Sequence, residues 1–392
     1  MLNINSNKLE ERIIAHRRFL HANPEVGFDL NKTVEYVKSV LAEAGIEHRS
    51  FGRCGVVATV GKGKKRCILL RADMDALPIK ENVCLEFSPK NGNMHGCGHD
   101  MHTAMLLGAA EILKSVEEQL SGCVKLMFQP AEELLLGAKD MIDAGVLEEP
   151  RVEAAVMLHV IPAAQLPIGT LVIPEGGEVA PAAVFFEINI TGKSSHGANP
   201  EDGVSALSLA AELVSNIESS SVRGDDGILT VGSFNSGNAA NVIPESAKIS
   251  GTYRAFTDDI QKRADDIFKR MMNEIFAEVD ATASVKYTAS APMLKINPDL
   301  ARFASECLPQ FLGDEGVYRT DSLGSESEIG GSEDFAYVSH RVPSLMLGIV
   351  ATGDTSVSLH NPKIVFDEHC LIKGAVAYAA MAIEYMKRDC PK

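Results

Sequence analysis

The sequence lacks the features that mark several large classes of protein. Among its 392 residues, 37 lysines and arginines face 53 aspartates and glutamates, and the formal net charge is −16. This deficit of positive charge argues against nucleic acid or an anionic membrane as a partner. The apolar runs are too short for a membrane-spanning helix, and the polar first ten residues lack the apolar segment of a signal peptide.

Cysteine motifs and several common catalytic motifs are also missing. Eight cysteines are scattered without a CxxC pair, and a chain of this length does not need disulfides. We therefore expect a reducing, cytoplasmic setting in which most cysteines are small buried apolar groups. HExxH and GxSxG are absent, and residues 61–65 (GKGKK) lack P-loop spacing, so they predict a hairpin turn and no phosphate site.

Residues 94–102 (MHGCGHDMH) are the most informative stretch that is present. They hold a thiol, three imidazoles and a carboxylate, separated by glycines. Thiolate and imidazole bind zinc and similar divalent ions, and glycine lets the backbone turn tightly enough for neighbouring side chains to reach one ion. A purely structural role suits one such residue better than five, so the stretch predicts a metal site.

Further candidate ligands lie near apolar runs elsewhere in the chain. In α/β folds, ligands bind outside the carboxyl ends of the sheet strands. Several of these candidates lie where a predicted strand gives way to a loop, so we expect one metal site assembled from several strand ends. The candidates are Asp73, Asp75, Glu132, Glu133, His159 and His360.

The hydrophobic pattern predicts two domains. Residues 8–45 have helical spacing, and strand-like runs then alternate with helices, including one from about His102 to Leu120. This alternation indicates an α/β sheet with helices on both faces. From Ala180 the order becomes strand-helix-strand-strand-helix-strand, which is the ferredoxin-like α+β pattern. We predict one discontinuous domain, 1–180 and 294–392, and one inserted domain, 181–293.

Six motifs occur in a fixed order along the chain. They are residues 71–78 (RADMDALP), 95–100 (HGCGHD), 129–133 (QPAEE), 195–200 (SHGANP), 241–244 (NVIP) and 331–335 (GSEDF). The chain resembles the amidohydrolase branch of the aminoacylase/carboxypeptidase family of dimetal metallopeptidases. That branch includes hippurate hydrolases, N-acyl-amino-acid deacylases and auxin-conjugate hydrolases. The resemblance extends from Arg18 to the last helix.

The resemblance implies a catalytic domain with two divalent metal ions (Zn, Mn, Co or Ni) and a smaller inserted lid domain. Glu132 matches the general base of the family. Lid contacts to the substrate map to His196, Asn241 and Arg254, of which His196 would also stabilise the oxyanion. The implied metal ligands are Cys97, His99, Glu133, His159 and His360.

The roles of three aspartates are less fixed. We expect Asp75 to assist catalysis by a hydrogen bond to a ligand imidazole. Asp73 could do the same or cap a loop, and Asp100 could bridge the metals or cap the helix that follows it. One departure from the family also matters, because residues 134–136 are leucines where the family has glycines. These leucines make the loop beside the metals bulkier.

The expected reaction is hydrolysis of the amide bond of a small N-acyl amino acid. An alternative is a dipeptidase or carboxypeptidase that acts on short peptides. A metal-containing binding protein is a third class, and Glu132 beside Glu133 argues against it because binding alone needs no base. The resemblance further suggests a homodimer or higher oligomer formed through the lid, with His196 serving the partner's active site.

Overall fold

The computed structural model describes residues 6–63, 66–219, 227–320 and 331–388, and it divides into two compact units. The first unit contains the described residues of 1–179, 295–326 and 334–392. The second contains those of 180–294 and 327–333. The second unit is therefore an insertion in the first, and each unit is described by itself.

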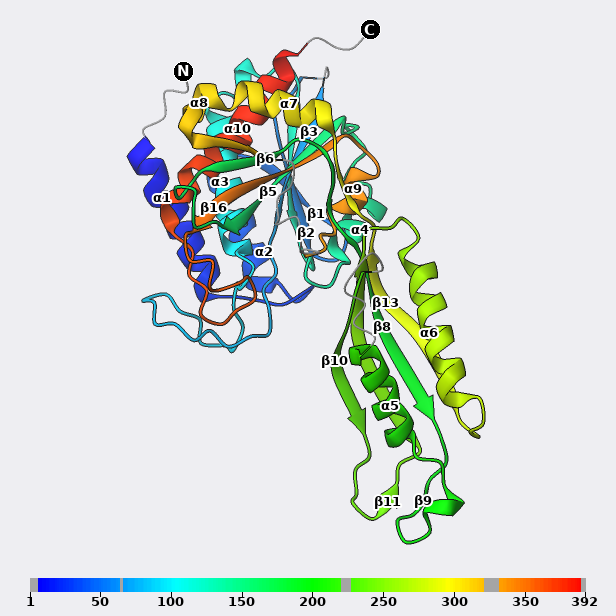
Figure 1. The fold of residues 1–392 in the computed structure, drawn as a ribbon. Helices are drawn as coiled ribbons and strands as arrows, with labels where there is room; N and C mark the ends of the chain where they lie inside the picture. Colours follow the sequence, from blue (N-terminus) through cyan, green and yellow to red (C-terminus); the bar gives the residue numbers. More distant parts are fainter. Residues whose placement is uncertain (1–5, 64–65, 220–226, 321–330, 389–392) are drawn as a thin grey trace. The chain divides into compact units, whose positions relative to one another are not determined.

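An eight-stranded mixed sheet forms the centre of the first unit (Figure 1), in the order β1-β2-β4-β3-β5-β16-β6-β15. The strands β4, β3, β5 and β16 are parallel to one another, so their carboxyl ends meet at one edge. Every side chain of β3 and β4 is buried, as central parallel strands require. The bounds are β1 Glu47–Phe51, β2 Gly55–Val60, β3 Cys67–Asp73, β4 Cys123–Gln129, β5 Ala154–Pro162, β6 Leu171–Pro174, β15 Val317–Thr320 and β16 Ser344–Thr352.

Helices cover both faces of this sheet, as predicted. On one face α3 packs against α1 and α10, and the Tyr378 hydroxyl of α10 donates to the Arg71 carbonyl of β3. On the other face α4 packs against α9, and the Arg71 side chain lies over Phe335, which precedes α9. The bounds are α1 Ser6–Ala22, α2 Asn31–Glu43, α3 His99–Ser115, α4 Gly137–Asp143, α7 Pro298–Cys307, α8 Pro309–Leu312, α9 Ala336–Ser339 and α10 Leu371–Lys387.

Short elements complete the list for this part of the chain. They are the 3₁₀ helices η1 Glu117–Gln119, η3 Asp314–Gly316 and η4 Glu368–Cys370, and the paired strands β7 Gly177–Ala180 and β14 Leu294–Ile296.

Two local predictions are corrected by the structure. The hairpin expected at 61–65 is wrong, because β4 lies between β2 and β3 and pairs with both. The helix expected from about His102 begins at His99. Gly98 has a left-handed φ of 80°, and its carbonyl accepts hydrogen bonds from the N–H groups of Met101 and His102. His99 therefore belongs to the first turn of α3.

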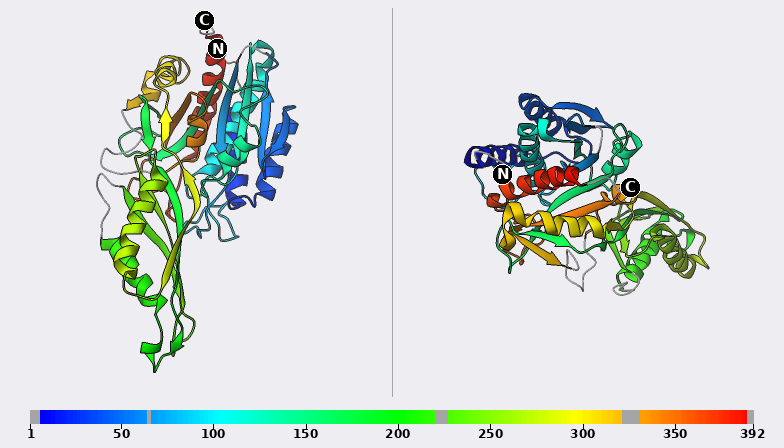
Figure 2. Two further views of the ribbon diagram at one scale, coloured as in Figure 1. Left: turned by 90° about the vertical axis from the view of Figure 1, so that its right-hand side faces the viewer. Right: turned by 90° about the horizontal axis from the view of Figure 1, so that it is seen from above.

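The second unit has the predicted strand-helix-strand-strand-helix-strand order. Its antiparallel sheet runs β10-β12-β8-β13, and α5 and α6 pack beside it (Figure 2), with the Phe186 and Phe268 rings 4.7 Å apart in the core. Among the described residues, no helix combines the length and apolarity needed to cross a membrane. The bounds are β8 Ala182–Thr191, β9 Ser195–His196, η2 Pro200–Asp202, α5 Ala206–Ser219, β10 Ile228–Ser236, β11 Val242–Ile243, β12 Ser246–Ala255, α6 Ile260–Phe276 and β13 Thr282–Ala291.

Candidate metal centre

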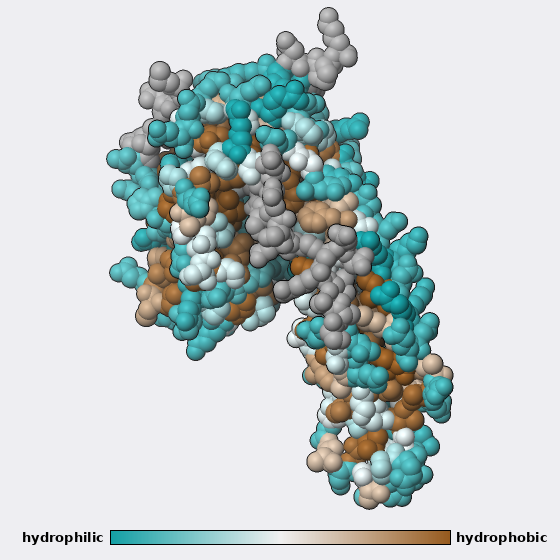
Figure 3. Space-filling view, viewed as in Figure 1, coloured by the Kyte–Doolittle hydropathy of each residue, from teal (hydrophilic) through white to brown (hydrophobic). Residues whose placement is uncertain are grey.

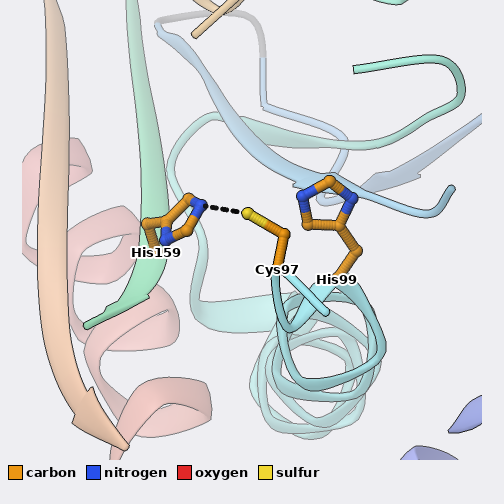
Figure 4. Close-up of side chains that lie close together, drawn as sticks. All are labelled: Cys97, His99 and His159. Carbon is orange, nitrogen blue, oxygen red and sulfur yellow. Dashed lines mark hydrogen bonds between the residues drawn. The ribbon is translucent and has the colours of Figure 1, made fainter. Parts of the chain in front are cut away.

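The five residues expected to bind metal lie together in the first unit. Cys97 precedes α3, His99 begins it, and His159 comes from β5, with the Cys97 Sγ 3.6 Å from the His159 Nε2 (Figure 4). The ligand atoms of these three residues lie within 4.8 Å of one another. The ligand atoms of Cys97, Glu133 and His360 do so as well. Cys97 belongs to both groups and therefore joins them.

Backbone carbonyls fix the orientation of two of the imidazoles. The His99 Nδ1 donates to the Asp75 carbonyl (2.8 Å), and the His159 Nδ1 donates to the Val160 carbonyl (2.7 Å). Because a carbonyl only accepts, the proton sits on Nδ1 and each Nε2 keeps a lone pair for a metal. The His99 Nε2 is buried and has no hydrogen-bond partner among the described residues. A bound ion would satisfy it.

His360 reaches the site from a strained backbone. Its φ is 64°, a left-handed value, and its N–H donates to the Gly96 carbonyl at 2.9 Å. Strain of this kind at a non-glycine residue is typical of functional positions. The His360 Nε2 lies 3.3 Å from the Glu133 carboxylate. The backbone bond thus holds His360 next to the loop that carries Cys97.

Asp75 holds the Glu132–Glu133 pair in place. Its two carboxylate oxygens accept the backbone N–H groups of Glu132 (3.0 Å) and Glu133 (3.2 Å). The hydrogen bond expected from Asp75 to a ligand imidazole is made by its backbone carbonyl, to His99, while its carboxylate lies 3.5 Å from the same nitrogen. Asp75 therefore connects a ligand histidine to the loop that carries both glutamates.

The electrostatics of the cluster favour a cation. Burial and Glu133 disfavour the Cys97 thiolate, but His159 and His360 outweigh them and lower its pKa to about 5. Hydrogen bonds to Cys97 and Glu133 raise the pKa of His360 to about 10. Burial lowers the pKa of His99, yet Asp73, Asp75 and Cys97 raise it well above its usual value. The cluster thus retains protons that a divalent ion can displace, and its thiolate, imidazole and carboxylate donors fit such an ion.

Asp73, Asp100 and His102 have other partners. Asp73 accepts from the His102 Nδ1 (2.6 Å), and the His102 Nε2 accepts from the Val160 N–H (2.9 Å), so both ring nitrogens are occupied. Asp100 instead contacts Arg17 (2.9 Å) and the His21 Nδ1 (2.8 Å). Within the described chain, no candidate metal group includes Asp100. These contacts support an ion-pair role for Asp100 in preference to a metal bridge.

The three predicted lid residues occupy two ends of the second unit. His196 lies opposite Val242 in the β9–β11 pair, and the Gly197 N–H donates to the Asn241 carbonyl (2.8 Å), so His196 and Asn241 are close neighbours. Arg254 lies near the far end of β12, opposite Ala183 of β8. The ten residues of β12 span about 30 Å. The structure therefore brings His196 and Asn241 together and separates them from Arg254.

A metal-binding cluster at the strand ends of a mixed sheet, with a second glutamate beside the ligand glutamate, defines a metal-dependent hydrolase. The model of peptidase family M20/M25/M40 matches residues 69–384 of this chain, and the chain belongs to that family. Family membership and the donor set together support divalent metal ions as cofactors.

Relatives whose names state an activity match almost the whole chain. An Arabidopsis thaliana protein named IAA-amino acid hydrolase ILR1-like 2 is 36% identical over 390 residues, which are 96% of this chain and 85% of the relative. The N-acetyl-L-cysteine deacetylase of Bacillus subtilis is 33% identical over 379 residues, with 95% and 88% covered. The structure of the Bacillus subtilis YXEP protein, described as a dinuclear metal binding peptidase from the M20 family, superposes with a TM-score of 0.76 at 30% identity and covers 97% and 99%.

Proposed function

We propose that this protein hydrolyses the amide bond of N-acyl amino acids with two divalent metal ions, releasing a carboxylic acid and a free amino acid. The observation that carries the proposal is the pair of ligand groups that share Cys97, with Glu132 beside them. The Glu132 carboxylate lies 3.9 Å from the His99 Nε2 and belongs to neither Cys97 group. It is therefore placed to act as a base next to the metals.

The residues divide the chemistry among them. When bound, divalent ions supply Lewis acidity and lower the pKa of a water molecule to about 7. Glu132 is placed to take a proton from the attacking water and to pass it to the nitrogen of the leaving amine. Asp75 keeps Glu132 oriented through the hydrogen bond to its backbone N–H. Glu133 has the ligand role and so does not compete for the proton.

The substrate would be recognised by side chains of the second unit. Arg254 can form a bidentate pair with an α-carboxylate, and His196 can donate to the developing oxyanion. A small N-acyl amino acid cannot contact both within one subunit, because they lie at opposite ends of the sheet that contains β12. This separation supports an arrangement in which His196 and Asn241 come from a partner subunit in a homodimer.

The surface of the second unit supports such pairing. Apolar residues reach its surface in the face shown in Figure 3. Exposed apolar side chains can contribute to an interface between subunits. The exposed large apolar side chains among its described residues are Leu207, Phe234, Val242 and Phe256.

The cysteines support the proposal of a cytoplasmic setting. All seven described cysteines are free, and five of them are buried. Cys67 and Cys123 are direct partners in the parallel ladder of β3 and β4 and still remain thiols. A reducing compartment preserves such a pair.

A substrate panel tests the reaction. The enzyme, loaded in turn with Zn²⁺, Mn²⁺, Co²⁺ and Ni²⁺, is assayed on N-acetyl, N-benzoyl and longer N-acyl amino acids and on matched dipeptides. We expect a higher kcat/KM for N-acyl amino acids with at least one metal. A consistent preference for dipeptides would favour the peptidase alternative, which the description of the YXEP protein also suggests.

A further inference from the structure

A buried network of charged and polar side chains joins Asp334 to the candidate metal ligands. We infer that Asp334 is a positioning residue for the metal site, acting through Arg71 and Gln129. The inference rests on the proposed metal centre and adds a role for residues 331–335, the one motif of the six with no role so far.

Asp334 is fully buried and accepts three hydrogen bonds. Its Oδ1 accepts from the Arg71 Nη2 (3.1 Å) and from the Gln129 Nε2 (2.7 Å), and its Oδ2 accepts from the Ala138 N–H (2.8 Å). All four residues are inaccessible to solvent. Hydrogen bonds to a charged group are strong in such an environment, so the geometry of this group is well defined.

One route from Asp334 leads through Arg71 to the histidines. The Arg71 Nη1 donates to Asp73 at 2.7 Å, so one guanidinium holds two carboxylates. Asp73 in turn accepts from His102 and lies 3.5 Å from the His99 Nε2. If Asp334 lost its charge, the charge of Arg71 would no longer be shared between the carboxylates of Asp334 and Asp73. Asp73 would then be drawn away from His99, whose Nε2 is the candidate ligand atom.

A second route leads to the loop that carries the glutamates. Gln129 precedes this loop and Ala138 follows it, and both donate to Asp334. The loop ends are packed so closely that a Cβ added at Gly137 would lie 1.6 Å from the Pro130 carbonyl oxygen. Asp334 therefore joins the two ends of the loop while Asp75 holds its middle. Glu132 and Glu133 depend on both aspartates for their position.

The test compares Asp334→Asn with wild type in the full-length protein. Asparagine keeps the shape and loses the charge. We expect the Kd for Zn²⁺, measured by competition with a coloured chelator after the metal has been removed, to rise about 10- to 100-fold, the range for partners of metal ligands. Activity should recover as the Zn²⁺ concentration rises. A purely structural role would instead lower the Tm of the metal-free protein and leave the Kd unchanged.

Two further variants keep the test decisive. Asp140→Asn is the matched control, since Asp140 lies on α4, pairs with Arg53 and, among the described residues, belongs to no candidate metal group. It should bind Zn²⁺ as wild type does. If Asp334→Asn does not fold, Gln129→Met is the second variant. It removes the hydrogen bonds of the Gln129 side chain with Asp334 and Arg71 and retains the Asp334 charge, and a several-fold rise in Kd is expected.

The possible outcomes distinguish an error about Asp334 from an error about the proposed function. Tight binding of Zn²⁺ by wild type and equally tight binding by the folded variants overturn the role of Asp334 alone. Failure of wild type to bind Zn²⁺, Mn²⁺, Co²⁺ or Ni²⁺ overturns the proposed function itself.

Discussion

The central sheets of the two units differ in the burial of their polar side chains. In β3 of the first unit every side chain is buried, and this includes Arg71 and Asp73. In β13 of the second unit, exposed and half-buried positions alternate along most of the strand, as in a sheet with one open face. Charged groups in the first sheet must therefore be paired inside the protein. Charged groups on the open face of the second sheet are hydrated and remain available to a ligand or to another subunit.

This difference determines what each unit can do alone. The first unit assembles the candidate metal cluster from its own residues, of which Cys97 and His99 are buried and His360 is exposed. The second unit carries His196, which is exposed and lies in the β9–β11 pair, and Arg254, which is half-buried and lies near the far end of β12. Changes in the first unit should therefore abolish metal binding or chemistry, and changes in the second should alter substrate recognition and depend on assembly.

The largest effect is expected from Cys97→Ser. Cys97 belongs to both candidate ligand groups, and a hydroxyl is a poor ligand for borderline-soft ions. We expect metal affinity to fall more than about a hundredfold, because partners outside the coordination sphere already contribute 10- to 100-fold. Metal analysis of the purified variant measures this. Exposed Cys84 offers the control Cys84→Ser. Full metal content and activity in Cys97→Ser would rule it out as a ligand.

Glu132→Gln should separate chemistry from metal binding within the first unit. Glutamine preserves the shape but cannot accept the proton, and the loss of a general base costs about 10²–10⁴-fold in kcat. Metal content should stay at the wild-type level. Glu133→Gln should have the opposite signature, with reduced metal content. Normal turnover by Glu132→Gln would mean that the roles assigned to these two glutamates are wrong.

His196→Ala tests whether the second unit acts on a partner subunit. The variant alone should lose about 10²–10³-fold in kcat, as expected for an oxyanion donor. It is then co-assembled with Glu132→Ala. Random mixing makes about half of the dimers mixed, and each mixed dimer has one complete site if His196 acts in trans, so roughly a quarter of wild-type activity should return. Mass spectrometry confirms the mixed dimers, and no recovery in their presence contradicts the trans arrangement.

Arg254→Ala should give the smallest and most selective effect. Loss of a charge-assisted pair of roughly 1.5–3 kcal/mol predicts about a 10- to 100-fold lower kcat/KM on substrates with a free α-carboxylate. Amidated analogues should change much less. Arg254→Lys keeps the charge without the bidentate geometry and should fall between wild type and Arg254→Ala. Equal losses on acid and amide forms would assign Arg254 a structural role.

The sequence was informative where chemistry follows local spacing. The thiol and imidazoles of residues 94–102, and the polar residues at strand ends, predicted the side chains that the structure brings together. The structure also shows how two of the leucines at 134–136 fit their loop. Leu134 is 37% exposed, whereas Leu135 is buried with a left-handed φ of 55°. Because Leu135 is not a glycine, its left-handed φ strains the backbone of this turn.

Other features depend on contacts that no local pattern encodes. Asp334 lies 263 residues from Arg71, and nothing in either motif indicates that they pair. The position of β4 between β2 and β3 is a property of sheet order, which a short link between two strands does not reveal. Strand β15 was missed because its four residues are exposed or half-buried and lack the apolar alternation of a strand.

The insertion of one unit in the other also sets an order of folding. In the first sheet, β16 lies between β5 and β6. The sheet is therefore incomplete, and the candidate metal cluster lacks His360, until residues 344–360 have been synthesised. The second sheet uses only residues 182–291, a continuous segment. At about 5–20 residues per second, roughly 3–14 s separate the synthesis of residue 291 from that of His360. The sheet of the second unit can thus form while the candidate metal cluster still lacks His360.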